Sequence, residues 1–341
     1  MAKRKKNSHQ NSENEKPDTR AQIVVAIIGA VAVVLAAIIT IIPELQKDVP
    51  LVISQTPPAT NEIAALTFTQ APIVTVTDLQ ATNTPQPSLA PTETYSLTPA
   101  SLSAEFTDAK GIEMILVSAG EFTMGSNYGE LDEQPAHKIF VGAFYIDKYE
   151  VTNGLYRVCV DQKMCQEPKA TSSKTHSVYF GNSDFDGYPV IYVDWNMAQS
   201  YCEWRGMRLP TEAEWEKAAR GINGRTYPWG EGINCDKANY NLCVGDVSKV
   251  GSYENGISPY GIEDMAGNVL EWVSDWYQSD YYHTIVGVED DPKGPMVGDV
   301  RVLKGGAWND KTTVRSSFRA WDNQTYTTNY YGFRCAKDAT P

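Results

Sequence analysis

The sequence predicts an α+β domain that is poor in regular secondary structure and is preceded by one transmembrane helix. The 341 residues include 25 Gly, 19 Pro, 8 Trp and 19 Tyr, a composition that favours short strands and turns over a helical bundle. Short apolar segments next to glycine turns indicate strands, and capping residues mark a few helices among them. One unbroken apolar run near the amino terminus is long enough to cross a bilayer.

The first 42 residues are typical of a membrane anchor. Residues 1–20 form a polar tail with six Lys or Arg, and the apolar run within residues 21–42 is interrupted only by Gly29 and Thr40. About twenty apolar residues at about 1.5 Å rise match a hydrocarbon layer of about 30 Å. Because the basic residues precede the run, the positive-inside rule places the amino terminus in the cytoplasm. A cleaved signal peptide is the alternative, although the run is longer than a typical signal core.

Residues 43–105 form a Thr/Pro/Ser-rich segment that we expect to be a disordered linker. Few large apolar residues occur together in it, so it cannot bury enough surface to offset the entropy of ordering. A stalk that holds the domain away from a membrane and a plain spacer are both consistent with this composition. Anchor and linker together predict a single-pass protein of the cell membrane with an extracytoplasmic carboxyl-terminal domain.

The remaining residues, 106–338, form one domain that begins with strands. Apolar residues predict strands at 115–117 and 121–125, on either side of a glycine turn, and a longer strand at 140–149.

The charge of the whole chain indicates which class of partner it does not bind. A net charge of −13 argues against a nucleic-acid partner, because phosphate binding depends on clustered Lys and Arg.

Three helices are predicted after these strands. One passes through Tyr156, a second is capped by Asp194, and a third begins after Thr211. Thr211 and Glu214 fit a capping box, in which the hydroxyl and the carboxylate bind each other's free backbone N–H groups. After Gly221 no helix pattern follows, so we expect turns and short aromatic strands to the end of the domain.

All six cysteines lie after residue 150, in the part expected outside the membrane, where disulfides are favoured. Two pairs are close in sequence, and pairing them leaves one pair that would join distant segments. The preferred pairs are Cys159 with Cys165, Cys235 with Cys243, and Cys202 with Cys335. Six cysteines allow fifteen pairings, so this set is a preference. A metal site is less compatible with the sequence, which has no Cys-x-x-Cys.

Eight short motifs of the domain occur in an order that identifies a family. They are Met124-Gly125, Asp132-Glu133-Gln134-Pro135-Ala136-His137, Glu150-Val151-Thr152-Asn153, Arg208-Leu209-Pro210-Thr211-Glu212-Ala213-Glu214-Trp215-Glu216, Tyr227-Pro228-Trp229-Gly230, Gly267-Asn268-Val269-Leu270-Glu271-Trp272, Gly305-Gly306 and Gly332-Phe333-Arg334-Cys335. Over about residues 110–338 they closely resemble the sulfatase-modifying-factor, or formylglycine-generating enzyme, domain family. The resemblance implies a compact mixed α/β fold related to C-type lectins, and a disulfide between Cys202 and Cys335.

The resemblance implies the fold without the activity. Active members of the family bind copper through two cysteines after the glycine pair and convert a sulfatase cysteine to formylglycine with oxygen. In this chain those positions hold Asp310 and Arg315, and the serine position after the glycines holds Ala307. Soft thiolate ligands are what select Cu(I), so we expect no copper and no catalytic residue of the family kind. A related iron-dependent branch needs histidines that this chain, with four His, does not supply in a suitable arrangement.

Structural calcium is a further implication of the resemblance. Hard oxygen ligands on a bent backbone suit Ca²⁺. The first family site corresponds to Asp264, Gly267, Val269 and Glu271, and the second to Asn239 and Tyr240 with Asp246 as the candidate acidic ligand. The alternative is that Asp264 caps a turn and Glu271 pairs with an arginine.

The family keeps its substrate groove near the end of the domain, and we expect a ligand groove there. Its candidate residues are Trp308, Asp310, Arg315, Trp321 and Asp322. Aromatic rings with arginine suit peptides, glycans or anionic groups. The alternative is core aromatics and internal salt bridges, which we favour for Arg301, Arg319 and Arg334.

Three hypotheses about function remain from the sequence. The first is a membrane-anchored extracytoplasmic binding module for a peptide, a glycan or a protein partner. The second is a formylglycine-generating type of oxidase with relocated ligands, and the third is a purely structural cell-surface domain. The replacement of the copper-binding cysteines favours the first hypothesis over the second.

Overall fold

The computed structural model describes residues 102–285 and 290–339. The predicted cytoplasmic tail, transmembrane helix and nearly all of the predicted linker lie outside these residues. Within the described part of the chain, no helix has both the length and the apolar character needed to cross a membrane.

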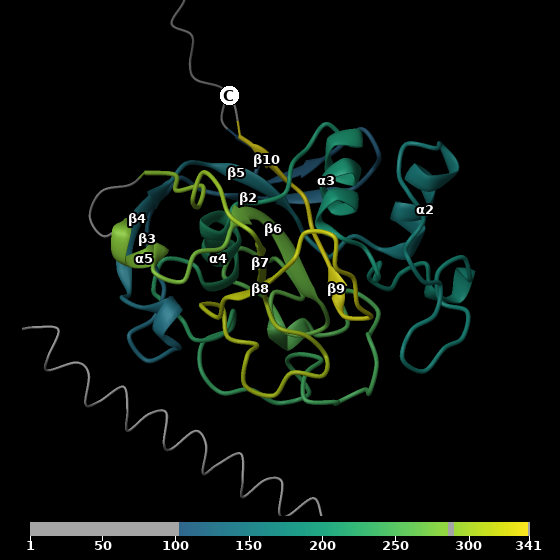
Figure 1. The fold of residues 1–341 in the computed structure, drawn as a ribbon. Coiled ribbons are helices and arrows are strands. Elements are labelled where there is room, and N and C mark those ends of the chain that lie inside the picture. Colours follow the sequence, from purple (N-terminus) through teal and green to yellow (C-terminus); the bar gives the residue numbers. More distant parts are fainter. Residues whose placement is uncertain (1–101, 286–289, 340–341) are drawn as a thin grey trace, which may run out of the picture. The chain divides into compact units, whose positions relative to one another are not determined.

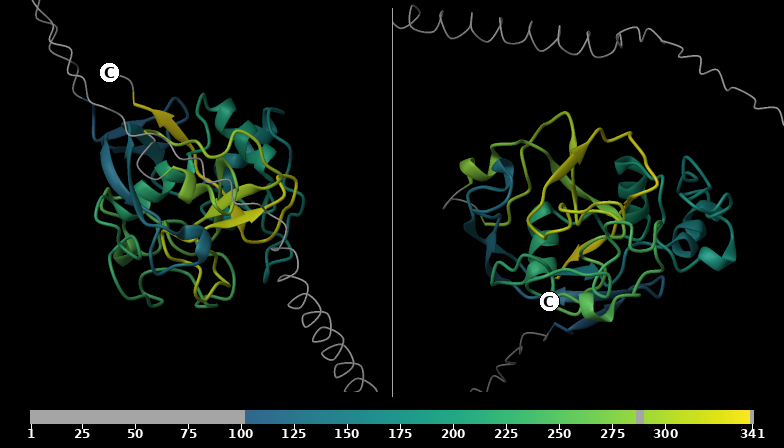
Figure 2. Two further views of the ribbon diagram at one scale, coloured as in Figure 1. Left: turned by 60° about the vertical axis from the view of Figure 1, so that its left-hand side comes forward. Right: turned by 90° about the horizontal axis from the view of Figure 1, so that it is seen from below.

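The first sheet joins the two ends of the domain. Its strands are, in spatial order, β1 (Glu105–Thr107), β2 (Glu113–Val117), β5 (Phe144–Asp147) and β10 (Ala336–Asp338). All neighbours are antiparallel, and the buried residues Ile115, Ile146 and Ala336 are aligned across β2, β5 and β10. A shift by one residue would turn them toward solvent, so burial fixes the register. The strand expected at 115–117 is therefore present as β2, and Figure 2 shows β10 (yellow) beside the amino-terminal strands (blue).

The second sheet is a hairpin of β3 (Gly120–Met124) and β4 (His137–Val141). The strand expected at 121–125 is present as β3, but the single strand predicted over 140–149 is wrong. That stretch contains the end of β4 and the whole of β5, which belong to different sheets and are separated at Gly142. Both strands bury apolar side chains, so the apolar pattern continues across the junction and hides the break.

The third sheet is built from the last third of the domain. Its strands are, in spatial order, β8 (Ala320–Asp322), β7 (Arg301–Lys304), β6 (Leu270–Trp276) and β9 (Tyr331–Gly332). β9 is parallel to β6, and the other pairs are antiparallel. The loop at 305–319 connects β7 to β8, so this sheet holds both ends of the segment that contains the candidate site.

The three predicted helices are confirmed, and so are the two predicted caps. They are α2 (Asn153–Asp161), α3 (Trp195–Trp204) and α4 (Glu212–Arg220). Asp194 accepts a hydrogen bond from the Met197 amide at 2.9 Å, and Thr211 forms the capping box with Glu214. A fourth helix, α5 (Tyr281–Thr284), contradicts the expectation of none after Gly221. Its single turn is too short to show a helical period. Short 3-10 turns are η1 (Leu131–Glu133), η2 (Ser183–Phe185) and η3 (Glu254–Gly256).

Helix α4 lies at the centre of the domain, in contact with β3, β6 and β7 (Figure 1). Trp215 on this helix is fully buried in the main hydrophobic core. The charged residues Glu212, Glu216, Lys217 and Arg220 are buried as well. Buried charges are stable only when they are paired, so α4 needs ionic partners from the segments that surround it.

All six cysteines of the chain form the disulfides preferred from the sequence. The pairs are Cys159–Cys165, Cys202–Cys335 and Cys235–Cys243. The second of them ties α3 to the residue just before β10, across 133 positions. Because the chain has six cysteines and every one is paired, no thiol is left for copper binding or for nucleophilic chemistry.

Candidate functional site

The glycine pair at the end of β7 turns the chain back toward α4. Gly305 and Gly306 have φ values of 94° and 70°, in the region that favours glycine. A Cβ atom on Gly306 would lie 2.6 Å from Cγ1 of Val314, so the loop also packs tightly on itself. This turn leads into the loop at 305–319, which contains the positions of the family's two cysteines.

Asp310, at the first cysteine position, closes the turn that follows. Its Oδ2 accepts a hydrogen bond from the Ala307 amide at 3.0 Å, and its own amide donates to the Ala307 carbonyl at 3.0 Å. The Asp310 carbonyl accepts from the Asn241 amide at 2.7 Å. Burial raises the pKa of the Asp310 carboxyl. The side chain therefore has a local structural role in the loop.

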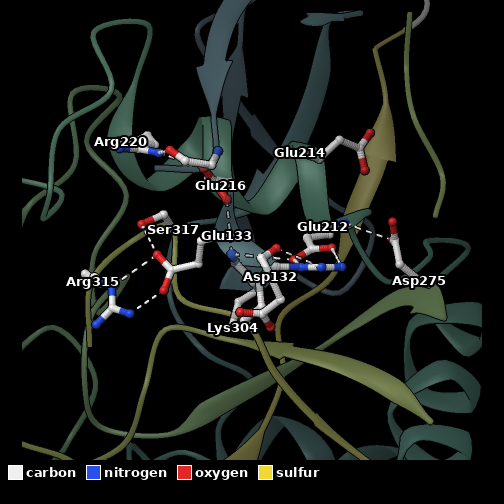
Figure 3. A network of polar contacts seen from close by, with 12 residues as sticks. Asp132, Glu133, Glu212, Glu214, Glu216, Arg220, Asp275, Lys304, Arg315 and Ser317 are labelled. Carbon is white, nitrogen blue, oxygen red and sulfur yellow. Dashed lines mark hydrogen bonds and ion pairs between the residues drawn. The ribbon is translucent and has the colours of Figure 1, made fainter. Parts of the chain in front are cut away.

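Arg315, at the second cysteine position, forms an ion pair with a buried glutamate (Figure 3). Its Nε lies 3.1 Å from Oε2 of Glu133, and its Nη2 donates to Oε1. Ser317 Oγ donates to the same carboxylate at 2.7 Å, and Glu133 is 0% exposed. Burial alone would raise the pKa of Glu133, but the hydrogen bonds from Arg315 and Ser317 outweigh it and hold the pKa below its usual value.

A second buried ionic network joins α4 to β7 and to the end of the loop (Figure 3). Arg319 binds Glu212 through Nε at 2.8 Å and Nη2 at 3.0 Å, and Lys304 Nζ lies 3.1 Å from Oε2 of Glu216. Although burial would raise the pKa of Glu212, the charges of Arg319 and Lys304 lower it. Asp275 accepts a hydrogen bond from the Glu212 amide at 2.9 Å. Burial raises the pKa of the Asp275 carboxyl to about 7.

The three arginines for which we favoured a structural role make internal contacts. Arg319 belongs to the network just described, and Arg334 pairs with Glu271. The Arg301 guanidinium lies between the rings of Trp195 and Trp276, at 3.8 and 3.5 Å from their centroids. Stacking of this kind favours a planar guanidinium over an ammonium.

The residues of the first predicted calcium site do not fit a calcium ion as the structure places them. Arg334 Nε and Nη2 bind the two oxygens of Glu271 at 2.7 and 2.8 Å, and Trp215 Nε1 donates to Oε2 at 2.8 Å. Oδ2 of Asp264 accepts from the Gly251 amide at 2.6 Å, and burial raises the Asp264 pKa to about 6. Among the described residues, none donates a hydrogen bond to the carbonyl of Gly267 or Val269, but a cation here would have to share Glu271 with Arg334.

The second predicted calcium site fits only in part. The Asp246 carboxylate accepts from five donors within residues 173–175 and Val247, which hold its pKa below the usual value despite burial. By contrast, Oδ1 of Asn239 is buried and has no hydrogen-bond partner among the described residues, and the Tyr240 hydroxyl donates weakly to the Ile233 carbonyl at 3.4 Å. Within residues 102–285 and 290–339, no three His, Cys, Asp or Glu side chains are grouped to hold a metal ion. Calcium at either site stays a prediction.

The five residues predicted to line a ligand groove do not gather on one surface. Trp308 is 4% exposed and packs in a core cluster with Tyr179 and Val269, because the turn at the glycine pair points its ring inward. Asp322 accepts a hydrogen bond from the Tyr331 hydroxyl at 2.8 Å. With Asp310 and Arg315 also engaged internally, only one aromatic residue of the predicted set remains open to solvent.

That residue is Trp321, which is 53% exposed. Its ring packs against Tyr277, with centroids 5.5 Å apart and planes at 30°. Tyr277 in turn lines an open cleft of about 530 Å³ between η1 and α5, together with Glu130, Asp132 and Asp280. We call this feature the acidic cleft. Its aromatic wall was not predicted, since Tyr277 and Trp321 lie 44 positions apart in sequence.

Glu133 is the other residue that sequence reasoning missed. It lies inside a family motif, but the pattern gives no sign that its partner is Arg315, 182 positions away. The charge of Arg315 could have indicated that such a partner exists. An arginine at a position where the family has a thiol requires a new acidic partner when it is partly buried. Among the eight motifs, the one with two adjacent carboxylates contains Asp132 and Glu133.

Comparison with known proteins identifies the family of the domain. The family model of the sulfatase-modifying factor enzyme 1-like domain matches residues 99–339. The formylglycine-generating enzyme of Streptomyces coelicolor is 32% identical over 289 residues, which cover 66% of this chain and 89% of that protein. The serine/threonine-protein kinase pkn1 of Chlamydia pneumoniae is 37% identical over 238 residues, which cover 66% of this chain but only 38% of that relative.

Solved structures agree with the sequence comparison. PvdO from Pseudomonas aeruginosa is 25% identical, with a TM-score of 0.58 over 70% of this chain and 99% of that chain. Treponema denticola variable protein 1, at 22% identity and a TM-score of 0.56, covers 70% of this chain and 100% of its own and shares the fold. The mixed α/β fold expected from the eight motifs is confirmed, and the chain belongs to the sulfatase-modifying factor enzyme 1-like domain family.

Proposed function

We propose that this protein is a membrane-anchored, extracytoplasmic binding module for a peptide, glycan or protein, without the oxidase activity of its enzymatic relatives. The observation that carries the proposal is the residue at position 315 and the ion pair that it forms. Where the active enzymes of the family place a copper-binding thiolate, Arg315 forms an ion pair with the buried Glu133. A guanidinium cannot bind Cu(I), and its removal would leave a buried carboxylate without its cation.

The disulfides support the same conclusion. All six cysteines of the chain are paired, so no other thiol stands in for those missing at Asp310 and Arg315. The carboxylate of Asp310, the guanidinium of Arg315 and the hydroxyl of Ser317 are held in internal hydrogen bonds. Such groups position a backbone, and none of them supplies a redox centre.

The proposed ligand face is the exposed side of the segment between Asn309 and Tyr326. Its exposed side chains are Asn309, Lys311, Thr312, Trp321, Asn323, Thr325 and Tyr326. Aromatic rings supply contact area at low entropic cost, and amide and hydroxyl groups adapt to polar partners. Beneath this face the loop is fixed by its ion pairs, which is the rigid support that a binding surface needs.

The comparison with pkn1 favours a module over an enzyme. In that relative the matched region makes up 38% of a longer protein, as expected of a domain that is combined with others. In this chain the predicted anchor at 21–42 and linker at 43–105 would present the domain outside the membrane. Calcium, proposed on the buried and unpartnered Oδ1 of Asn239, would stabilise loops and take no part in chemistry.

The test of the proposal is an activity assay on the full chain. The purified protein is incubated with Cu(I), oxygen and a cysteine-containing sulfatase-motif peptide, and the Streptomyces coelicolor enzyme serves as the positive control. Mass spectrometry should show no conversion of cysteine to formylglycine above the level given by copper alone. Conversion that depends on the protein would overturn the proposal.

A second experiment tests the binding face. Peptide and glycan arrays probed with the full chain should give signals that Trp321→Ala weakens at least about five-fold. The matched control is Trp204→Ala on α3, a partly buried tryptophan that donates to Gln162 at 3.2 Å and lies outside this face. Equal signals from the two variants would contradict the assigned face.

A further inference from the structure

We infer that the disulfide between Cys235 and Cys243 is a redox-sensitive switch on the loop at 305–319, and that a dithiol reductant opens it selectively. The disulfide closes residues 235–243 into a ring, and this ring donates two hydrogen bonds to the loop. The inference rests on the proposed function where it concerns ligand binding, because the loop contains the start of the proposed ligand face.

The ring holds the loop through backbone contacts. The Asn241 amide donates a hydrogen bond to the Asp310 carbonyl at 2.7 Å, and the Leu242 amide donates to the Trp308 carbonyl at 2.8 Å. Among the described residues, no other backbone amide donates to either carbonyl. The two bonds therefore fix the backbone on both sides of Asn309, the first exposed residue of the proposed ligand face.

The same two residues of the ring have a backbone conformation that needs a constraint. Asn241 and Leu242 are consecutive and have φ values of 46° and 63°, in the left-handed region that is unfavourable for residues with a Cβ atom. The Leu242 side chain is 60% exposed, so burial does not hold it in this conformation. The next residue, Cys243, is fixed by the disulfide and donates its amide to the Tyr240 carbonyl at 2.8 Å.

The segments on both sides of this turn are anchored without the disulfide. Asn239 is 1% exposed, its carbonyl accepts a hydrogen bond from the Asn268 amide at 2.8 Å, and its Nδ2 donates to the Asp246 carbonyl at 2.8 Å. The Asp246 carboxylate is held by donors within residues 173–175. Opening the ring should therefore release residues 240–245 and leave the hydrophobic core of the domain intact.

The burial of the cysteines makes the reduction selective. Thiol–disulfide exchange requires that a thiolate reach one sulfur of the disulfide. Cys159, Cys202 and Cys335 are 0% exposed, and Cys165 is half-buried. Of the six cysteines only Cys235 is exposed, so its disulfide is the one that a reductant can attack without prior unfolding.

The reaction consumes one dithiol molecule. Its first thiolate attacks the Cys235 sulfur, forms a mixed disulfide and displaces Cys243 as a thiolate. Its second thiol attacks the mixed disulfide, so the reductant leaves as an internal disulfide and Cys235 is released. Two electrons and two protons pass to the protein, which gains two thiols. The left-handed pair can then relax, and residues 309–312 lose the backbone bonds that support them.

Dithiothreitol is the probe, added to the oxidised full chain, and alkylation with mass spectrometry locates the thiols that form. We expect the pair Cys235–Cys243 to be reduced at least about ten-fold faster than either other pair. Hydrogen exchange of the selectively reduced protein should be at least about ten-fold faster in peptides that contain residues 240–245 and 309–312. Exchange in the strands β2 and β5 should not change.

Two double variants separate the opening of the ring from other effects of the reductant. Cys235→Ser combined with Cys243→Ser should show the exchange of the reduced wild type, with no further change in dithiothreitol. The matched control is Cys159→Ser combined with Cys165→Ser, which removes a disulfide of similar sequence separation, 6 against 8. This control should leave exchange in residues 240–245 and 309–312 unchanged.

The effect on ligand binding is measured on the peptide and glycan arrays. Because a loop held in one conformation loses less entropy on binding, the selectively reduced chain should give signals at least about five-fold weaker than the oxidised chain. Equal signals from the two forms would overturn control of the ligand face by this disulfide. A lack of any signal from the oxidised chain would instead be a failure of the proposed function, and hydrogen exchange would still decide whether the switch exists.

Three results would overturn the switch itself. The first is faster reduction of another pair, and the second is unchanged exchange at 240–245 and 309–312 after reduction. The third is loss of protection throughout the domain, or failure of the Cys235→Ser, Cys243→Ser variant to fold, because either would show that this disulfide supports the whole fold.

Discussion

Replacing Arg315 by methionine should destabilise the domain because it leaves Glu133 buried without its cation. Glu133 is 0% exposed, and its remaining donors would be Ser317 Oγ at 2.7 Å and the Glu130 amide at 3.0 Å. Breaking a buried ion pair costs about 3–5 kcal/mol. Since the Arg315 side chain is 18% exposed, we expect about 2–4 kcal/mol.

Urea unfolding of the full chain, followed by tryptophan fluorescence, measures this loss. The control is Arg157→Met, which removes an equally bidentate pair with Asp186, at 2.6 and 2.7 Å, that is 31% and 36% exposed. An exposed pair contributes about 0–1 kcal/mol, so the two arginines should differ clearly. Equal losses would refute the view that position 315 is held by a buried partner.

The pH dependence of the same variant gives an independent signature. In the wild type the pKa of Glu133 lies below its usual value because Arg315 and Ser317 bind the carboxylate, so this stabilisation is present at neutral pH and is lost on acidification. In the Arg315→Met variant, burial would instead raise the pKa of Glu133. Protonation would then remove the cost of a buried charge without a partner. The stability difference between wild type and variant should therefore shrink as the pH falls from 7 toward 4. A constant difference would contradict the assignment.

Three further predictions concern the rest of the domain. Burial raises the pKa of Asp275 to about 7, above its unfolded value, so its contribution is present at acid pH and lost as the pH rises. Between pH 5.5 and 8 the free energy of unfolding of the wild type should fall by about 2 kcal/mol more than that of Asp275→Asn. Urea unfolding that gives the same pH dependence for both proteins would contradict this. Replacing Cys202 and Cys335 together by serine should lower the stability by about 4–5 kcal/mol, more than removal of either short-loop disulfide; thermal unfolding of the three variants gives the order. Calcium should raise the unfolding temperature of the wild type and not that of Asn239→Ala, whose buried Oδ1 has no protein partner; no shift in the wild type would remove calcium from the account.

Much of the fold was predictable because it depends on local signals. Thr211 with Glu214 marked the start of α4, Asp194 marked α3, and these caps act within one helical turn. The disulfides followed from spacing and from the family resemblance. The boundary between β4 and β5 was missed because both strands bury apolar side chains, so periodicity alone shows no break there.

The site was less predictable because it depends on contacts between distant segments. The sequence shows that Arg315 stands where a thiolate is expected, but it does not show that Glu133 is its partner. It places Trp308 and Trp321 in one groove, whereas the structure buries Trp308 at 4% exposure and leaves Trp321 at 53%. Side chains in an irregular loop have no period that assigns them to one face, and only the packing of the whole domain decides their direction.

The central claim is that the fold of the formylglycine-generating enzymes is kept here without their copper centre. Titration of the full chain with Cu(I), in competition with a chelator of known affinity, tests it most directly. We predict no stoichiometric site, because Asp310 and Arg315 hold the family's two thiolate positions and all six cysteines are in disulfides. One tightly bound Cu(I) per chain under non-reducing conditions would contradict the account.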